Sequence, residues 1–328
     1  MSMPMQDART RRGFTLIEVL VVIAIIGLLL GLLLPAVQMA RAAASRARCA
    51  NNIKQIGQAI QLHAEARNTF PGGSGPGPAY PSYLVQILPH LENAPLYNAI
   101  NLGGKVSLSS AANLTAQGQT PGIFLCPSDA GRRPDMEDAI NYAGNAGRDA
   151  NQGQGVFIGK PLAARDITDG LSQTAGVAEW LVGAGFGVDF IAGQGRDLSM
   201  IERNRQRYKL KQVYSDNPLD LAAFVRACGT FDPADIDPRG ISGVPKGSLW
   251  LQGGILGGTL YNHMMRPNQP SCWADQSMVA VTASSLHVGG AHMLTMDGGV
   301  RFVKDSIDPQ VWSAVGTRSG GEVVASGF

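Results

Sequence analysis

The chain has little charge of either sign and few aromatic residues. Charged residues make up 16% of its 328 residues, aromatic residues 6%, and the formal net charge is only +2. This near-neutral balance gives no support for a nucleic-acid partner, which needs a basic surface. The sequence also lacks a nucleophile elbow, a phosphate-binding loop, an H-E-x-x-H pair and a dinucleotide-binding glycine fingerprint. These absences favour a protein that is not an enzyme and holds no cofactor.

Cysteine is scarce, and its spacing excludes the common zinc motifs. The four cysteines, Cys49, Cys126, Cys228 and Cys272, contain no C-x-x-C pair. In an oxidising compartment they can form two disulfides, with three possible connectivities. We expect Cys49 to pair with Cys126 and Cys228 with Cys272. The first disulfide would join the N-terminal helix to the head, and the second would close a loop in the C-terminal part of the chain. Free buried thiols are the alternative.

What the sequence does have is one membrane-length apolar run. From Leu16 to Leu34 the only ionisable side chain is Glu18, and nineteen helical residues reach about 28 Å, close to the hydrocarbon thickness of a bilayer. The run is longer than the apolar region of a secretory signal, although the alanine-rich residues 40–44 could imitate a cleavage site. Basic residues of the preceding segment stay on the cytoplasmic side. We therefore expect a single-pass inner-membrane protein whose head is extracytoplasmic, in the periplasm or at the cell surface.

The acidic residue in this run needs an explanation. A carboxylate at the centre of a membrane helix costs about 2.5–3.5 kcal/mol on insertion scales, and less near an end. Glu18 therefore indicates a partner within the membrane. The alternative is a plain anchor in which Glu18 sits at the headgroup level and does nothing.

Residues 13–18, GFTLIE, follow Arg11 and Arg12 and resemble the processing signal of type IV prepilins and type II secretion pseudopilins. The resemblance implies that a prepilin peptidase cuts between Gly13 and Phe14 and methylates the new amine of Phe14. It also implies that Glu18 pairs with the N-terminal amine of a neighbouring subunit. A glycine before the scissile bond lets the backbone approach the peptidase closely.

The helix is expected to continue past Pro35 to about Arg67, because the sequence stays rich in helix formers. Ile53, Ile56, Ile60 and His63 recur at helical spacing, with Gly57 on the same side, and should pack on the head. The expected fold is α+β and pilin-like, with this helix on a mostly antiparallel sheet and an elaborated glycine-rich head. The expected parts are a leader at 1–13, a transmembrane and stalk helix at 14–67 and a head at 68–328.

Several head segments carry local signals. Residues 122–129, 156–160 and 174–183 read as strands, and the glycine- and asparagine-rich residues 141–147 read as a loop. Residues 201–213 alternate five basic side chains, which would share one face of a strand and repel each other. A mobile exposed ribbon is the expectation there, and an anionic envelope polymer or acidic subunit as its partner is the alternative.

Near the C-terminus, residues 292–296 and 300–304 predict a hairpin with Asp297 and Gly298 in the turn, both at positive φ or in a bulged version. The spacing His287, nine residues, Asp297-Gly298 resembles the H-x(9)-D-G signature of a large bacterial family of prepilin-like proteins of unknown function. Segments CANNIKQIGQAI, TFPGG, FLCPSD and GTRSGGEVV also resemble that family. The favoured interpretation of the signature is structural, with Asp297 in the turn and His287 bonded to a neighbouring loop.

The alternative interpretation of this region is a metal or catalytic site. His287, His292 and Asp297 stand five residues apart, so they converge only if the chain bends, for which Gly289-Gly290 is suited. We expect no metal, and a structural subunit of the pseudopilin or minor-pilin type. The partners would be prepilin peptidase, the membrane and other pilin-like subunits. A membrane-tethered binding protein that never polymerises is the alternative, and an envelope hydrolase using His287 and Asp297 a lesser one.

Overall fold

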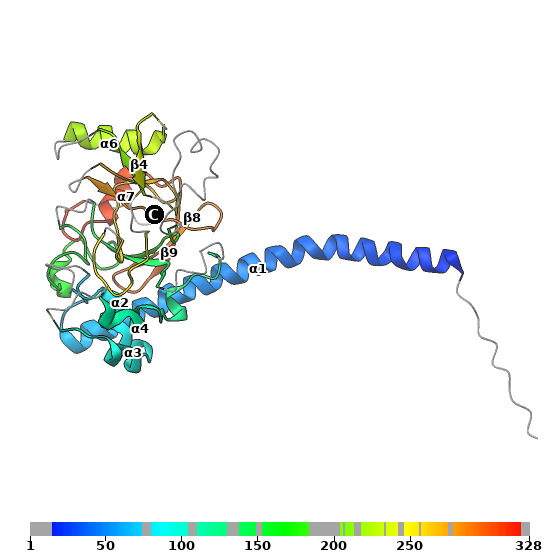
Figure 1. Cartoon of the computed structure of the whole chain (residues 1–328), viewed down its shortest axis with the longest axis horizontal. Coiled ribbons are helices and arrows are strands. Elements are labelled where there is room, and N and C mark those ends of the chain that lie inside the picture. Colours follow the sequence, from blue (N-terminus) through cyan, green and yellow to red (C-terminus); the bar gives the residue numbers. More distant parts are fainter. Residues whose placement is uncertain are drawn as a thin grey trace, which may run out of the picture. The chain divides into compact units, whose positions relative to one another are not determined.

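The fold is α+β, with one long N-terminal helix and a head that contains two β-sheets (Figure 1). The computed structural model describes residues 15–73, 80–103, 110–129, 138–148, 153–183, 204–205, 207–212, 218–232, 234–241, 246–255, 257–274 and 278–322. Two compact units divide the chain between Ser45 and Arg46, and each is considered by itself. This is the pilin-like class that the sequence predicts.

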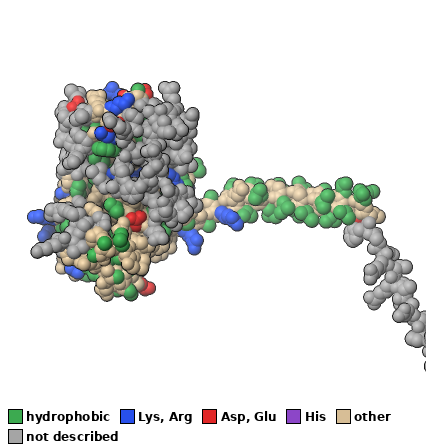
Figure 2. Space-filling model, viewed as in Figure 1, with side chains coloured by type: hydrophobic (Ala, Val, Ile, Leu, Met, Phe, Trp, Pro, Cys, Tyr) green, Lys and Arg blue, Asp and Glu red, His purple; other side chains and the backbone are tan. Residues whose placement is uncertain are grey.

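The N-terminal unit holds the apolar part of helix α1 (Leu16–Arg67). Its leucine, isoleucine and valine side chains between Leu16 and Leu34 are exposed, and Figure 2 shows hydrophobic atoms along this part of the helix. Among the described residues, α1 is the one helix long and apolar enough to cross a membrane. Pro35 lies inside α1, and the helix continues through it as expected.

The C-terminal part of α1 belongs to the head. Its buried residues include Ile53, Ile56, Gly57, Ile60 and His63, which confirms the predicted packing stripe. At Gly57 a Cβ atom would lie 2.5 Å from a methyl carbon of a leucine on the facing sheet, so glycine permits the close approach of helix and sheet.

The first sheet has five strands in the order β5-β1-β2-β8-β9. These strands are β1 (Tyr142–Asn145), β2 (Ala175–Glu179), β5 (Leu260–Tyr261), β8 (Gly290–Thr295) and β9 (Val300–Lys304). All pairs are antiparallel except β1 with β5. The mostly antiparallel sheet and the β8–β9 hairpin are therefore confirmed. Of the two turn residues only Gly298 has positive φ, at 85°, so the bulged version of the turn is the correct one.

Three local expectations in the head are wrong. Residues 141–147 contain the buried strand β1 rather than a loop, because their small side chains let aromatic rings pack closely over the strand. At Gly144, for example, a Cβ atom would lie 2.8 Å from the ring of Phe157. Residues 122–129 begin with the 3-10 helix η3 (Gly122–Phe124) rather than a strand, and residues 156–160 form no described strand.

The second sheet has four strands in the order β4-β3-β6-β7. They are β3 (Arg207–Leu210), β4 (Ile236–Ile241), β6 (Ser271–Trp273) and β7 (Val279–Ala280). Helix α6 (Pro218–Thr230) contributes Phe224 and Cys228 to the same hydrophobic cluster. The remaining described helices are α2 (Tyr83–Ile87), η1 (Leu88–Leu91), α3 (Ala94–Ala99), η2 (Ala111–Asn113), α4 (Leu114–Gln117), η4 (Ala164–Asp166) and α7 (Pro309–Val315).

The basic segment 201–213 is not an exposed ribbon in its described part, and that expectation is wrong. Arg205 is 7% exposed and Arg207 2% exposed, and strand β3 lies between β4 and β6. Lys209 forms an ion pair of 3.2 Å with Asp237, and Lys211 is exposed. Arg203 lies outside the described residues. Only Arg207 and Lys209 of the five basic residues lie on strand β3, and Arg205 precedes the strand and pairs with the distant residue Asp129.

A buried histidine lies between the first sheet and helix α7. The His263 ring stacks on Trp312 with 4.0 Å between centroids. Its Nδ1 donates to the Trp312 carbonyl at 2.8 Å, and the Tyr261 hydroxyl donates to its Nε2 at 2.9 Å. Burial lowers the pKa of His263 from 6.5 to about 3, since desolvation outweighs the hydrogen bond to Trp312. The ring is therefore neutral in the folded head.

We expect this histidine to make the head less stable in acid. The unfolded chain takes up a proton on His263 below pH 6.5 whereas the folded chain does so only near pH 3, so the free energy of unfolding falls as pH drops between these values. The slope contributed by one group is about 1.4 kcal/mol per pH unit. Urea unfolding of the detergent-solubilised chain at pH 6.5 and 4.5 measures it, and His263→Gln should have the shallower dependence. Equal pH dependence in both proteins would contradict the prediction.

Candidate functional site

At the membrane end, the structure gives Glu18 a local partner. Gly13 and Phe14 lie outside the described residues, whereas Thr15 precedes α1 and Glu18 stands in its first turn. The Thr15 backbone N–H and hydroxyl both donate to Glu18 Oε2 at 2.8 Å, and the Glu18 N–H donates to the Thr15 hydroxyl at 3.3 Å. This is a capping box, a helix-start motif that the sequence analysis missed although Thr-x-x-Glu was its signal.

Asp297 serves the hairpin turn, as the structural interpretation predicts. Its Oδ1 accepts hydrogen bonds from the Thr295 hydroxyl at 2.6 Å and from the Gly299 N–H at 3.0 Å. Burial raises the pKa of Asp297, but these hydrogen bonds lower it by more, so the net shift is downward. The Gly298 carbonyl accepts from Lys54 of α1 at 2.7 Å, which ties the turn to the helix.

His287 meets a different carboxylate, that of Glu179 at the end of β2. His287 Nε2 lies 3.3 Å from Glu179 Oε1, and His292 Nδ1 lies 3.0 Å from the same oxygen. The His292 backbone N–H donates to Glu179 Oε2 at 2.8 Å. His287 thus bonds to a strand residue rather than to a neighbouring loop. His287 and His292 both contact Glu179, whereas Asp297 bonds within its own turn.

A bend brings the two histidines together. Gly289 has a φ of 83°, and at Gly290 a Cβ atom would lie 2.0 Å from the Val303 carbonyl oxygen. Only glycine fits both positions, so the chain turns sharply before β8. The rings of His287 and His292 end with their centroids 5.1 Å apart in a T-shaped contact. The chain thus bends at Gly289-Gly290, the place that the alternative metal interpretation required, but the bend brings together the two histidines and not Asp297.

Glu179 is a buried and ionised carboxylate. It is 1% exposed, and burial by itself raises its pKa, but the hydrogen bonds and charges of His287 and His292 lower it by more. A carboxylate enclosed in this way requires partners, because an isolated buried charge costs several kcal/mol. Glu179 was missed in the sequence because TAGVAEWLVG gives no sign of which strand face is buried.

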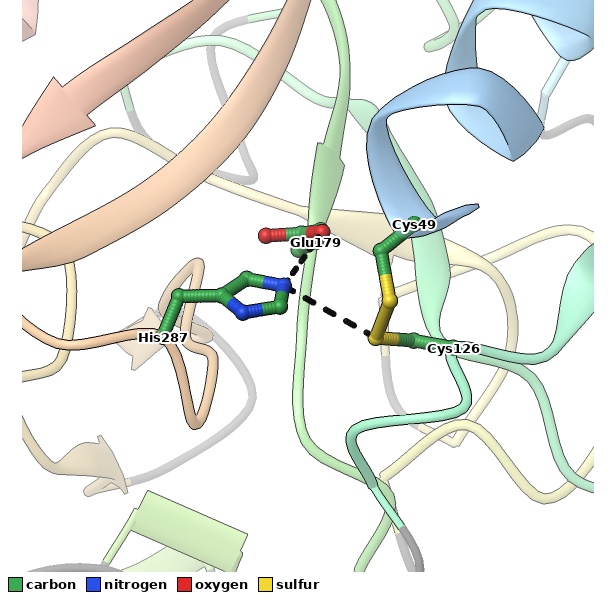
Figure 3. A group of neighbouring side chains, drawn as sticks. All are labelled: Cys49, Cys126, Glu179 and His287. Carbon is green, nitrogen blue, oxygen red and sulfur yellow. Dashed lines mark hydrogen bonds and ion pairs between the residues drawn. A yellow bond between two sulfur atoms is a disulfide. The ribbon is translucent and has the colours of Figure 1, made fainter. Parts of the chain in front are cut away.

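The two histidines and the carboxylate lie beside a disulfide. Cys49 and Cys126 are bonded with 5.0 Å between their Cα atoms, and Cys228 and Cys272 with 5.9 Å, which is the expected connectivity. His287 Nε2 lies 3.9 Å from Cys126 Sγ (Figure 3). Helix α1, the segment after η3, strand β2 and the loop before β8 each contribute one of the four residues in this view.

A second buried polar network borders this cluster. Asp129 accepts hydrogen bonds from Arg205, from Asn141 at 2.7 Å and from the Val182 N–H at 3.1 Å. Lys246 is also buried, close enough to Asp129 and Arg205 to interact with their charges. Burial lowers the pKa of Lys246 to about 7, and the positive charges of Arg205 and Arg207 contribute to this shift.

Lys246 also contacts a serine hydroxyl. Its ammonium donates to the Asn204 carbonyl at 2.7 Å and to Ser284 Oγ at 3.2 Å. A lysine next to a serine is an arrangement that some hydrolases use. Here both side chains are 2% exposed or less, and Ser284 Oγ also accepts from the Leu181 N–H at 3.0 Å. The burial and the hydrogen bonds favour a structural role for the pair.

These features define a pilin-like protein with one membrane-length helix in its described part and, at the start of that helix, the signal of processed prepilins. Comparison with known families agrees, because residues 8–34 match the prokaryotic N-terminal methylation motif. Residues 38–310 match the family described as protein of unknown function (DUF1559), and the chain belongs to that family. No curated protein and no solved structure matches. The resemblance to a prepilin-like family of unknown function is confirmed, and the H-x(9)-D-G spacing as its signature stays a prediction.

Proposed function

We propose that this protein is a structural subunit of the cell envelope, of the pseudopilin or minor-pilin type, and not an enzyme. Prepilin peptidase removes the leader 1–13 and methylates Phe14, the helix 14–67 remains as anchor and stalk, and the head 68–328 faces the extracytoplasmic side. The observation that carries the proposal is an exposed apolar stem with Glu18 in its first turn, within the match to the N-terminal methylation motif.

The stem supports assembly with like subunits in the membrane. Its apolar side chains are exposed on all sides of α1 between Leu16 and Leu34, so several stems can lie side by side within lipid. The capping box uses Glu18 Oε2, and a neighbouring N-terminal amine is a chemically suitable partner for the remaining charge of the carboxylate.

The head supports an extracytoplasmic and non-enzymatic role. Two disulfides are typical of proteins that fold in an oxidising compartment. The hydrolase alternative requires His287 and Asp297 to act together, yet His287 bonds to Glu179 and Asp297 to its own turn. These separate contacts count against a shared catalytic role.

One observation favours the display alternative. A cleft of about 580 Å³ lies between the C-terminal part of α1 and the segments around η1 and η3. Both polar and apolar residues line it. Its polar residues include Gln55, Gln58, His90, Glu92 and Asn93. A cleft of this size fits a small ligand, so a tethered binding head that never polymerises is the second candidate.

Cross-linking of the stems tests assembly against display. Val22 of the stem is 48% exposed and Leu102 of the head 37% exposed, so Val22→Cys and Leu102→Cys give matched single reporters. In native membranes we expect oxidation to give dimers through position 22 and far fewer through position 102. Intact mass of the same sample should show a chain that starts at methylated Phe14.

The display alternative makes the opposite forecast. A tethered head that stays single would give equally low dimer yields at both positions. Such a result, together with correct processing at Phe14, would overturn the structural-subunit proposal and leave the processed anchor standing. An intact Met1 would overturn the processing step itself.

A further inference from the structure

Four buried groups around the Cys49–Cys126 disulfide have the composition of a metal site. The sulfur atoms of Cys49 and Cys126, a carboxylate oxygen of Glu179 and a ring nitrogen of His287 all lie within 4.8 Å of one another. Figure 3 shows one ring nitrogen of His287 facing both the Glu179 carboxylate and the sulfur atom of Cys126. All four residues are buried, and they come from four separate segments of the head.

The spacing of these atoms is close to that of tetrahedral zinc. Zinc binds sulfur at about 2.3 Å and nitrogen or oxygen at about 2.0–2.2 Å, which places neighbouring ligand atoms about 3.3–3.8 Å apart. His287 Nε2 lies 3.3 Å from Glu179 Oε1 and 3.9 Å from Cys126 Sγ. The sulfur pair itself is the exception, because the covalent bond holds the two atoms closer than a metal would.

Surrounding groups hold the two non-sulfur ligands in place. The His292 ring and backbone N–H fix both oxygens of Glu179, at 3.0 and 2.8 Å. The backbone N–H of His287 donates to the Ser285 hydroxyl at 3.0 Å, and that hydroxyl donates to the Gly290 carbonyl at 2.6 Å, which fixes the backbone from which the imidazole projects. Such outer partners orient ligands and strengthen metal binding by about 10–100-fold.

We propose that reduction of the Cys49–Cys126 disulfide converts this cluster into a site for one zinc ion, held by the two thiolates, His287 Nε2 and a Glu179 oxygen. The disulfide takes two electrons and two protons from a dithiol reductant, which becomes a disulfide itself. Zinc then displaces both thiol protons to solvent, and His287 binds through its Nε2 lone pair with its proton on Nδ1. The head thus has two alternative cross-links at one place, a covalent bond and a metal.

Metal binding by the full-length chain in detergent tests this proposal. The chain is reduced with a water-soluble phosphine, freed of reductant under anaerobic conditions and titrated with Co²⁺ and then Zn²⁺. We expect the intense visible bands and sulfur-to-cobalt charge transfer of tetrahedral cobalt, displaced by one zinc per chain. The oxidised chain should show neither. The double variant Cys228→Ser/Cys272→Ser should keep this site, because its sulfur ligands come from the other pair.

Variants of the non-sulfur ligands separate a built site from two adventitious thiols. His287→Ala and Glu179→Gln should each weaken zinc binding by more than about 100-fold, since losing a ligand costs at least as much as losing an outer partner. His90→Ala is the matched control, because His90 lies in the cleft instead, and it should bind like the wild type.

Three results would overturn the proposal. The first is a zinc affinity of His287→Ala that equals that of the wild type. If His287→Ala does not fold, the same comparison is made with Glu179→Gln or Cys126→Ser. The second is equal zinc uptake by the oxidised chain. The third is a reduced chain whose circular dichroism shows that it has unfolded and which takes up no zinc. The site requires a head that stays folded in its dithiol form.

Discussion

Replacing Arg205 with methionine is expected to lower the free energy of unfolding of the head by about 3–5 kcal/mol. Arg205 forms a buried ion pair with Asp129 and also donates to the Val182 carbonyl at 3.1 Å. The side chains of the pair are 9% and 1% exposed, so the Asp129 carboxylate cannot turn to water when its partner is removed. Methionine keeps most of the volume, and the loss therefore reports the unpaired charge.

Urea unfolding of the detergent-solubilised chain, followed by near-ultraviolet circular dichroism, measures this loss. Lys211→Met is the matched control, because the Lys211 side chain is exposed and its ammonium donates to the Ala234 carbonyl, while no buried carboxylate is described as its partner. It should change stability by less than about 0.5 kcal/mol. The double variant Asp129→Asn/Arg205→Met removes both charges and should recover part of the loss. An equal cost for Lys211→Met and Arg205→Met would contradict a buried pair.

The basic segment also shows where reading a sequence fails. Alternation along 201–213 indicated which side chains would share a face if the segment were a strand, but the described strand covers only Arg207–Leu210 and is not an exposed ribbon. Whether Arg205 meets solvent depends on Asp129, which lies 76 residues earlier in the chain and offers no local sign of the contact. Repulsion among like charges was therefore overestimated, since a distant carboxylate and backbone carbonyls offset it.

Features with a strong local cause were predictable. The stem helix follows from its apolar run, its buried stripe from helical spacing, and the β8–β9 hairpin from alternation around Asp297-Gly298. The strand β1 was not, because Tyr142–Asn145 consists mostly of small or polar residues whose extended conformation is imposed by pairing with β2 and β5. Tertiary contacts override local propensity there.

The cluster around Glu179 contains one feature with a local sequence signal and one without. The bend at Gly289-Gly290 has a local signal in its two glycines, which the sequence analysis considered only under the metal interpretation. Glu179 has none, because β2 is buried along its whole length and alternation cannot reveal an inward carboxylate. The pair His287 and Asp297 looked like one unit in the sequence, but the hairpin directs Asp297 into its own turn while the bend turns His287 toward β2.

Replacing Glu18 with glutamine is expected to reduce dimer formation through stem position 22 at least about tenfold, which corresponds to a loss of about 1.4 kcal/mol. Glutamine can still close the capping box with Thr15, and it also crosses into lipid more easily than a carboxylate. Helix start and membrane insertion are therefore preserved, and what is lost is the charge that would pair with a neighbour's N-terminal amine. The yield of Val22→Cys cross-links, at equal membrane content of both proteins, measures the effect.

Thr15→Val separates the two roles of the carboxylate. This variant removes the hydroxyl that bonds Glu18 in both directions but leaves the charge, so the capping box is weakened and the intersubunit pair is kept. If Glu18 acts between subunits, cross-linking in Thr15→Val stays within about twofold of the wild type while Glu18→Gln loses it, because losing a cap costs only about 1 kcal/mol of local helix stability. If both variants cross-link like the wild type, Glu18 is a local cap, and the stems associate through their apolar surfaces alone.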